Sequence, residues 1–171
     1  LWGEYNRGKV ECEMVLERSG VRYAALRPVY ILGAKNSVDR ERFIYSKVKA
    51  GLPLELPGNG QAMVQFVYAG DVAESLTLLV EKKFGGAFNC AGDDSVTLKG
   101  FVEVMAKIVG KEAVIQYGPH TDREESDPSG FPFANEHLLC ANAKLKSLGW
   151  KPTQLAAFLK QDYDSYYQYA V

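Results

Sequence analysis

A helix-like segment that leads directly into an apolar strand constrains the fold of this chain more than any other feature. Residues 3–20 place apolar side chains such as Val10 and Met14 at helical spacing and end at Ser19-Gly20, a typical helix stop. Residues 21–30 follow as a run rich in aromatic and aliphatic residues, as in a buried strand. A helix joined to such a strand is half of an alternating unit, so an α/β fold is predicted. We expect the partners of this strand upstream of residue 1.

The rest of the chain continues this alternation of helices and strands. Helical spacing followed by stop signals predicts further helices over residues 39–50, 69–83, 98–109, 143–148 and 154–169. Short apolar runs predict strands within residues 51–60 and over 64–68, 87–90 and 113–117. Gly58-Asn59-Gly60 is interpreted as a turn, because neither a third glycine nor a helix follows it. His120, in the irregular stretch 118–135, is interpreted with its acidic neighbours as part of a solvated loop and not as a metal site.

Composition excludes several classes of protein. A formal net charge of −1 gives no general attraction to nucleic acid or anionic membranes. No apolar run reaches the roughly 20 residues that a membrane helix needs. Cys12, Cys90 and Cys140 are far apart and lack metal-ligand spacing, so we expect three small buried side chains in a reducing compartment. That compartment is the cytoplasm, or the plastid stroma if the source is a plant.

A candidate for proton chemistry lies in the first helix. Tyr5 and Lys9 are four residues apart and therefore share one face of a helix. The ammonium of Lys9 favours the phenolate of Tyr5, and a phenol needs such help before it can move protons at neutral pH. Tyr45 and Lys49 repeat the spacing, so the pair taken alone also fits a surface or packing role.

Several short motifs follow one another along the whole chain. They are Tyr5-x-x-x-Lys9, RPVYILG at 27–33, FVYAGDVA at 66–73, FNCAG at 88–92 and LGWKP at 148–152. In this order they resemble the extended short-chain dehydrogenase/reductases, the family of NAD-dependent epimerases and dehydratases. Within that family the chain is similar to the chloroplast stem-loop-binding proteins and their bacterial relatives, on the basis of RPVY, the segment 61–68, and FPF at 131–133 followed by His137.

The resemblance implies a fold and a domain organisation. The expected fold is α/β, the C-terminal portion of a Rossmann-type enzyme with a small α+β substrate-binding domain, without the N-terminal dinucleotide-binding half. Residues 1–34 would be the last helix-strand unit of the Rossmann domain, and residues 35–171 the substrate-binding domain with the closing C-terminal helices. The glycine fingerprint that opens a Rossmann fold is missing, and Leu1 stands close to a motif, which fits the tail of a longer protein.

The resemblance also implies an activity, that of an NAD(P)-dependent sugar-nucleotide epimerase, dehydratase or reductase. Tyr5 would exchange a proton with a substrate hydroxyl while hydride moves to or from NAD or NADP. Lys9 would also hold the nicotinamide ribose, and Pro28, Val29 and Tyr30 would pass beside the nicotinamide. Residues 1–171 alone are expected to bind no cofactor and to be inactive.

The implied substrate is a small molecule, and a nucleotide sugar is the first candidate. The arginine that commonly holds a nucleotide-sugar phosphate falls at Val64, and valine makes no bidentate phosphate contact. Gln61, Gln65 and Tyr68 remain as candidate substrate contacts.

RNA is the alternative partner, implied by the stem-loop-binding relatives. Lys144, Lys146 and Lys151 would contact phosphates and Trp150 would stack on a base, against the competing interpretation of a solvated helix face with a buried Trp. A third interpretation is a pseudoenzyme that only mediates assembly. Because strand 21–30 would lack its upstream neighbours, we also expect self-association through its open edge.

Overall fold

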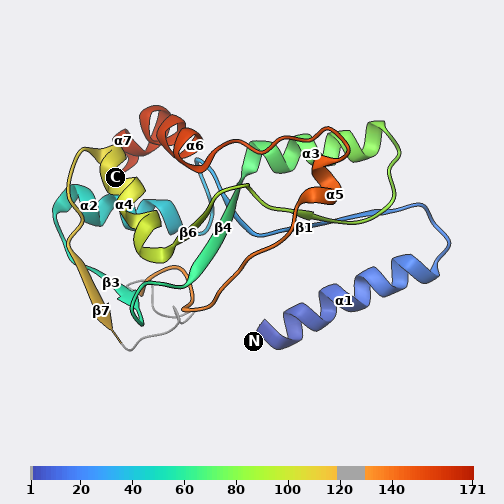
Figure 1. The fold of residues 1–171 in the computed structure, drawn as a ribbon, viewed down its shortest axis with the longest axis horizontal. Coiled ribbons are helices and arrows are strands. Elements are labelled where there is room, and N and C mark those ends of the chain that lie inside the picture. The colour runs from blue at the N-terminus through green and yellow to red at the C-terminus, as the bar shows by residue number, and fades with distance from the viewer. Residues whose placement is uncertain (1, 119–129) are drawn as a thin grey trace.

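The computed structural model describes residues 2–118 and 130–171, which form an α/β fold (Figure 1). The helical elements are α1 (Trp2–Arg18), α2 (Arg40–Ala50), α3 (Ala69–Glu81), α4 (Leu98–Val109), α5 (Ala143–Lys146), α6 (Leu155–Asp162), the π-helical turn η1 (Tyr163–Tyr167) and α7 (Gln168–Ala170). The strands are β1 (Ala24–Pro28), β2 (Tyr30–Leu32), β3 (Leu54–Pro57), β4 (Met63–Tyr68), β5 (Gly86–Cys90), β6 (Ser95–Thr97) and β7 (Ile115–Gly118). The predicted alternation of helices and strands is confirmed, and β6 is the strand that the sequence did not predict.

The strands pair mostly in parallel, as an α/β fold requires. β1 runs parallel to β5, β2 runs parallel to β4, and β3 runs parallel to β7, while β6 adds an antiparallel edge to β4. The backbone N–H of Gly92 donates to the carbonyl of Phe66 at 2.8 Å and so links the end of β5 to β4. The carboxyl ends of β1, β5, β2 and β4 are the ends from which a ligand site in such a sheet is built.

The segment predicted as one strand over residues 21–30 is two strands with different neighbours. β1 pairs with β5, whereas β2 pairs with β4, and the change falls at Val29, whose N–H donates to the Cys90 carbonyl at 3.1 Å. The expectation that all partners of this strand lie upstream of residue 1 was wrong, because β5 lies downstream. An alternating pattern cannot show a change of partner, since both strands bury side chains of the same kind.

Two clusters of buried side chains form the core. One cluster gathers around α2, α4, α6 and β4 and includes Leu32, Ile44, Phe101, Phe133 and Phe158. The other gathers around β1, β5, α3 and α5 and includes Val29, Val67, Phe88, Leu145 and Trp150. Both clusters contain residues from after position 34. The predicted division into residues 1–34 and 35–171 stays a prediction.

The closing helix departs from the prediction of one continuous helix over residues 154–169. It passes through the π-helical turn η1, which widens the helix between α6 and α7. The wider turn brings Tyr163 and Tyr167 against the same ring of Tyr45, with centroid distances of 4.9 and 5.2 Å. It also lets the Tyr167 hydroxyl donate to the carbonyl of Gly33 at 3.1 Å. Tyr163 and Tyr167 thus pack the closing helix against α2.

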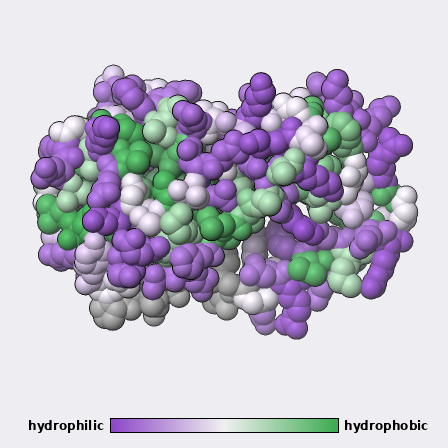
Figure 2. Space-filling view, viewed as in Figure 1, coloured by the Kyte–Doolittle hydropathy of each residue, from purple (hydrophilic) through white to green (hydrophobic). Residues whose placement is uncertain are grey.

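Helix α1 lies apart from the other helices (Figure 1), and hydrophilic side chains cover most of it on the face shown in Figure 2. Its apolar residues Val10, Met14 and Val15 are exposed. Cys12 on the same helix is exposed as well, which corrects the expectation that all three cysteines are buried. Cys90 does fit that expectation, and burial raises the pKa of its thiol to about 11. None of the helices in the described ranges combines the length and apolar character needed to cross a bilayer.

Candidate functional site

Tyr5 and Lys9 lie on the same side of α1, as their spacing predicted. The Nζ atom of Lys9 is 5.2 Å from the centroid of the Tyr5 ring, and the Tyr5 side chain is 56% exposed. The spacing thus places a cation beside the phenol ring, and the catalytic role of the pair stays a prediction.

An ion pair joins α1 to β1. The Nε atom of Arg27 donates to both carboxylate oxygens of Glu13, at 2.9 and 3.1 Å, and a second guanidinium nitrogen contacts Oε2. This contact lowers the pKa of Glu13 and raises that of Arg27. The helix that carries Tyr5 and Lys9 is thus tied to the strand that ends in Pro28.

The three residues predicted to pass beside the nicotinamide differ in how far their side chains are exposed to solvent. Pro28 is exposed at the end of β1, opposite Cys90. The Val29 side chain is 7% exposed and packs in the core, so its backbone is the part available to a ligand. Tyr30 is half-buried, packs edge-on against Phe133 at 5.0 Å and has the guanidinium carbon of Arg40 5.2 Å from its ring centroid.

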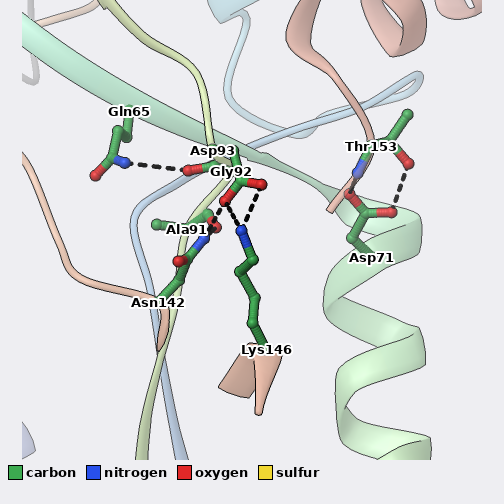
Figure 3. A network of polar contacts seen from close by, with 8 residues as sticks. All are labelled: Gln65, Asp71, Ala91, Gly92, Asp93, Asn142, Lys146 and Thr153. Carbon is green, nitrogen blue, oxygen red and sulfur yellow. Dashed lines mark hydrogen bonds and ion pairs between the residues drawn. The ribbon is translucent and has the colours of Figure 1, made fainter. Parts of the chain in front are cut away.

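Gln65 holds three segments of backbone together instead of facing a ligand. Its Nε2 donates to the Gly92 carbonyl at 3.1 Å (Figure 3), and its Oε1 accepts from the Cys140 N–H at 2.7 Å. Both ends of the amide are occupied, which argues against the predicted substrate contact. The sequence did not show this, because the partners are 27 and 75 residues away.

The two other predicted substrate residues lie at opposite ends of the segment 61–68. Gln61 is exposed beside the turn at Gly58 and Gly60, both of which have the positive φ that such a turn requires. Tyr68 is half-buried, and its ring stacks on Phe158 at 5.2 Å and 18°. Burial, with the nearby acidic side chains, raises the pKa of Tyr68.

Val64 lies between these residues and is fully buried in β4. A cationic side chain at this position would have to enter the core, where an unpaired charge costs several kcal/mol. The phosphate-binding role that the family resemblance assigns to this position is therefore not carried out by residue 64.

Long-range polar contacts connect two of the sequence motifs, FVYAGDVA at 66–73 and LGWKP at 148–152. Asp71, which follows β4, accepts hydrogen bonds from the Thr153 N–H at 2.7 Å and the Thr153 hydroxyl at 2.8 Å (Figure 3). Its backbone carbonyl accepts from the indole N–H of Trp150 at 3.0 Å. Asp71 lies in the first turn of α3, where its negative charge also meets the positive end of the helix dipole. Its role as an anchor for residues 150–153 was missed.

The residues proposed for RNA contact are largely engaged within the protein. Trp150 is 4% exposed and so offers no face for a base. The ammonium of Lys146 pairs with Asp93 at 2.7 Å and lowers the pKa of that carboxylate (Figure 3), and the ammonium of Lys144 donates to the Ala87 carbonyl at 2.8 Å. Lys151 is exposed. The structure thus contradicts the stacking role of Trp150 and agrees with a buried Trp beneath a polar surface.

A pair of buried carboxylates that the sequence did not indicate holds the loop after β2. Glu41 Oε1 accepts the Gly33 N–H at 2.6 Å, and Asp162 Oδ2 accepts the Ala34 N–H at 2.9 Å. Both carboxylates are at most 4% exposed, and burial raises the pKa of each, that of Glu41 to about 7. The clamp joins α2 and α6 to the segment that follows the predicted nicotinamide strand.

Among the described residues, neither metal-ligand groups nor surface hollows add a candidate functional site. Within residues 2–118 and 130–171, no group of three or more His, Cys, Asp or Glu is placed to hold a metal ion. His120 and its acidic neighbours lie outside the described residues. A surface hollow of about 420 Å³ lies between α4 and β7 and is lined by none of the predicted site residues.

Comparison with known proteins identifies a family and several relatives. The model of the NAD dependent epimerase/dehydratase family matches residues 4–91, about half of the chain. The chloroplast stem-loop binding protein of 41 kDa b from Arabidopsis thaliana is 32% identical over 152 residues, which cover 86% of this chain and 40% of that protein. GDP-L-fucose synthase 1 from the same plant is 28% identical over 127 residues, 73% of this chain and 36% of that protein.

Solved structures share the fold. UDP-N-acetylglucosamine 4-epimerase from Methanobrevibacter ruminantium, in complex with UDP-N-acetylmuramic acid, superposes with a TM-score of 0.76 at 20% identity, over 94% of this chain and 52% of that one. UDP-glucose 4-epimerase from Thermus thermophilus, in complex with NAD, superposes with a TM-score of 0.71 at 20% identity, over 95% and 52%. The chain thus spans about half the length, or less, of the proteins it matches. The motifs, the fold and the family match together establish that this chain belongs to the NAD-dependent epimerase/dehydratase family.

Proposed function

We propose that this chain supplies the proton-transferring helix and the substrate side of an NAD(P)-dependent oxidoreductase of the sugar-nucleotide epimerase/dehydratase type. The observation that carries the proposal is the position of Lys9 on the Tyr5 ring, within the part of the chain that matches the family. Tyr5 is the acid/base and exchanges a proton with a hydroxyl of the substrate. Lys9 is the cation beside this phenol and assists the proton exchange.

The residues present fit one end of a dinucleotide. Tyr5, Lys9 and the exposed end of β1 at Pro28 suit the nicotinamide and its ribose, whereas the 171 residues contain no G-x-G-x-x-G loop for the pyrophosphate. The nicotinamide supplies a hydride acceptor or donor when it is bound. The pyrophosphate would be held by a part of the protein outside residues 1–171, so we expect this chain alone to bind no NAD(P) and to be inactive.

The proposed substrate is a small hydroxylated molecule. The solved relatives are described with UDP-linked sugars, and we propose a sugar of this class for the present protein. Tyr68 is the better of the predicted substrate contacts, since Gln65 is occupied by backbone groups. Because Val64 is buried, any phosphate of the substrate must be held by another group.

The test is a pair of tyrosine substitutions in the full-length gene product. Tyr5→Phe should lower kcat by about 10²-fold to 10⁴-fold, the usual contribution of a positioned acid/base, at unchanged thermal stability. Tyr117→Phe is the matched control, because Tyr117 is 52% exposed and lies on β7. Undiminished turnover in Tyr5→Phe would refute the proposed function and favour a protein that only mediates assembly.

RNA binding is a second candidate, because the Arabidopsis relative is a stem-loop binding protein. Lys144, Lys146 and Lys151 are all exposed, and because Lys144 contacts the Ala87 carbonyl and Lys146 pairs with Asp93, Lys151 is the one to substitute. If RNA binds through phosphate contacts, Lys151→Ala should weaken binding and the affinity should fall steeply with added salt. Affinity that is insensitive to salt would exclude phosphate contacts. A reducing compartment, either cytoplasm or plastid stroma, is compatible with both candidates.

A further inference from the structure

The ion pair between α1 and β1 has a geometry that fixes orientation as well as distance. Arg27 approaches Glu13 with two nitrogens, and both oxygens of the carboxylate accept. A planar fork that meets a carboxylate in this way restrains the angle between the two groups, which a lysine ammonium cannot do. The contact therefore restrains the rotation of α1 about its own axis.

Glu13 lies on the side of α1 that carries the proposed acid/base. Tyr5, Lys9 and Glu13 are spaced four residues apart, and such residues follow one another along one side of a helix. Arg27 immediately precedes Pro28, where β1 ends and where the proposed nicotinamide site begins. One contact thus connects the proton-transferring side of α1 to the end of the strand that faces the cofactor.

We propose that Arg27 and Glu13 are positioning residues that hold the Tyr5–Lys9 side of α1 in register with the carboxyl end of β1. This inference rests on the proposed function, and it adds that the reaction depends on a pair of side chains that touch neither substrate nor cofactor. Catalysis is sensitive to misplacement of this kind, since a displacement of 1 Å at a reacting group can cost about 10²-fold in rate.

A role of the ion pair in positioning α1 can be distinguished from a role in global stability. The two side chains are 55% and 26% exposed, and ion pairs that are open to solvent contribute little to global stability. Removing the pair should therefore leave the melting temperature of the chain almost unchanged while it frees α1. The position of α1 and the stability of the core can be measured separately.

The experiment measures the distance between two spin labels on the 171-residue chain. One label sits on Cys12, which is exposed on α1, and the other on Glu81→Cys at the end of α3, in a Cys140→Ser background. The parent chain should give one narrow distance peak. Glu13→Gln and Arg27→Lys should each lower the ratio of molecules inside that peak to molecules outside it by up to about fivefold, the equivalent of an exposed ion pair.

The controls separate this inference from the proposed function. Glu17→Gln removes an exposed carboxylate one turn further along α1 and should leave the peak unchanged, and the exchanged pair Glu13→Arg with Arg27→Glu should restore it. In the full-length gene product, Glu13→Gln should lower kcat by a similar factor at unchanged KM. A peak that stays narrow in Glu13→Gln and Arg27→Lys overturns the positioning role, whatever the activity. Turnover that survives Tyr5→Phe overturns the proposed function, and the distance measurement still decides whether the pair orients α1.

Discussion

Replacing Glu41 by glutamine should remove most of the fall in stability that this chain shows as pH rises through the neutral range. Glu41 is 1% exposed, and its two oxygens accept from the Gly33 N–H at 2.6 Å and the Asn36 amide at 3.2 Å. These hydrogen bonds and the nearby Arg40 favour the ionised form. Burial outweighs them and raises the pKa of Glu41 from 4.5 to about 7.

The direction follows from proton binding. Because the pKa is higher in the folded state, the folded state binds more protons than the unfolded state between pH 4.5 and about 7. The stabilising contribution is fully present below pH 4.5 and is lost as pH rises through about 7. At roughly 1.4 kcal/mol per pKa unit, the loss is about 3 kcal/mol. The raised pKa of Asp162 acts in the same direction and steepens the fall.

Urea denaturation followed by tryptophan fluorescence at about pH 5 and about pH 8 measures this difference. Glutamine keeps an oxygen that accepts the Gly33 N–H but carries no ionisable proton, so Glu41→Gln should lose about 2.5 kcal/mol less between these two pH values. Glu74→Gln, which removes an exposed carboxylate from α3, should behave like the parent chain. Equal losses in the parent chain and in Glu41→Gln would refute the argument that burial controls this carboxylate.

Three other changes test the contacts that shape the fold. Gln65→Ala should destabilise the chain by about 1–3 kcal/mol in urea denaturation, because the Gly92 carbonyl and the Cys140 N–H lose their partner, whereas the exposed Gln61→Ala should stay within about 0.5 kcal/mol. Trp150→Phe should cost a similar amount in thermal unfolding followed by circular dichroism, because the buried Asp71 carbonyl loses the indole donor, and an unchanged transition would contradict this role. Among the described residues β1 pairs with a single strand, β5, so light scattering should show self-association that grows with concentration, and a monomer at high concentration would exclude it.

Elements with strong local signals were predictable from the sequence. Helix α4 begins and ends where it was predicted, at Leu98 and Val109. Its start is marked by Thr97, whose hydroxyl accepts the Gly100 N–H at 2.9 Å, and its end by Gly110 with a φ of 76°. Both signals are read within a few residues of the helix ends, so they need no knowledge of the rest of the fold.

Features that depend on contacts distant in sequence were not predictable in this way. The Glu41 and Asp162 carboxylates meet neighbouring N–H groups of one loop from positions 121 residues apart, and nothing near either residue marks it as buried. Gln65 was expected to face the substrate because it lies next to the position at which the family's phosphate-binding arginine falls, and its actual partners come from two remote segments. The proximity of Tyr5 and Lys9 was predictable because helical spacing sets it, whereas the environment of Gln65 was not, because long-range packing decides it.

The two pairs of tyrosine and lysine at the same spacing, Tyr45–Lys49 and Tyr5–Lys9, lie in different environments. Tyr45 is fully buried in α2 and its hydroxyl donates to the Leu159 carbonyl at 3.2 Å, while burial raises its pKa far above the usual range. Lys49 donates to the Gln168 carbonyl at 3.0 Å and so serves the closing helix. That phenol can neither lose its proton nor meet a substrate. Tyr5 is open to solvent with an ammonium against its ring, so the same spacing there leaves the phenol accessible to a ligand.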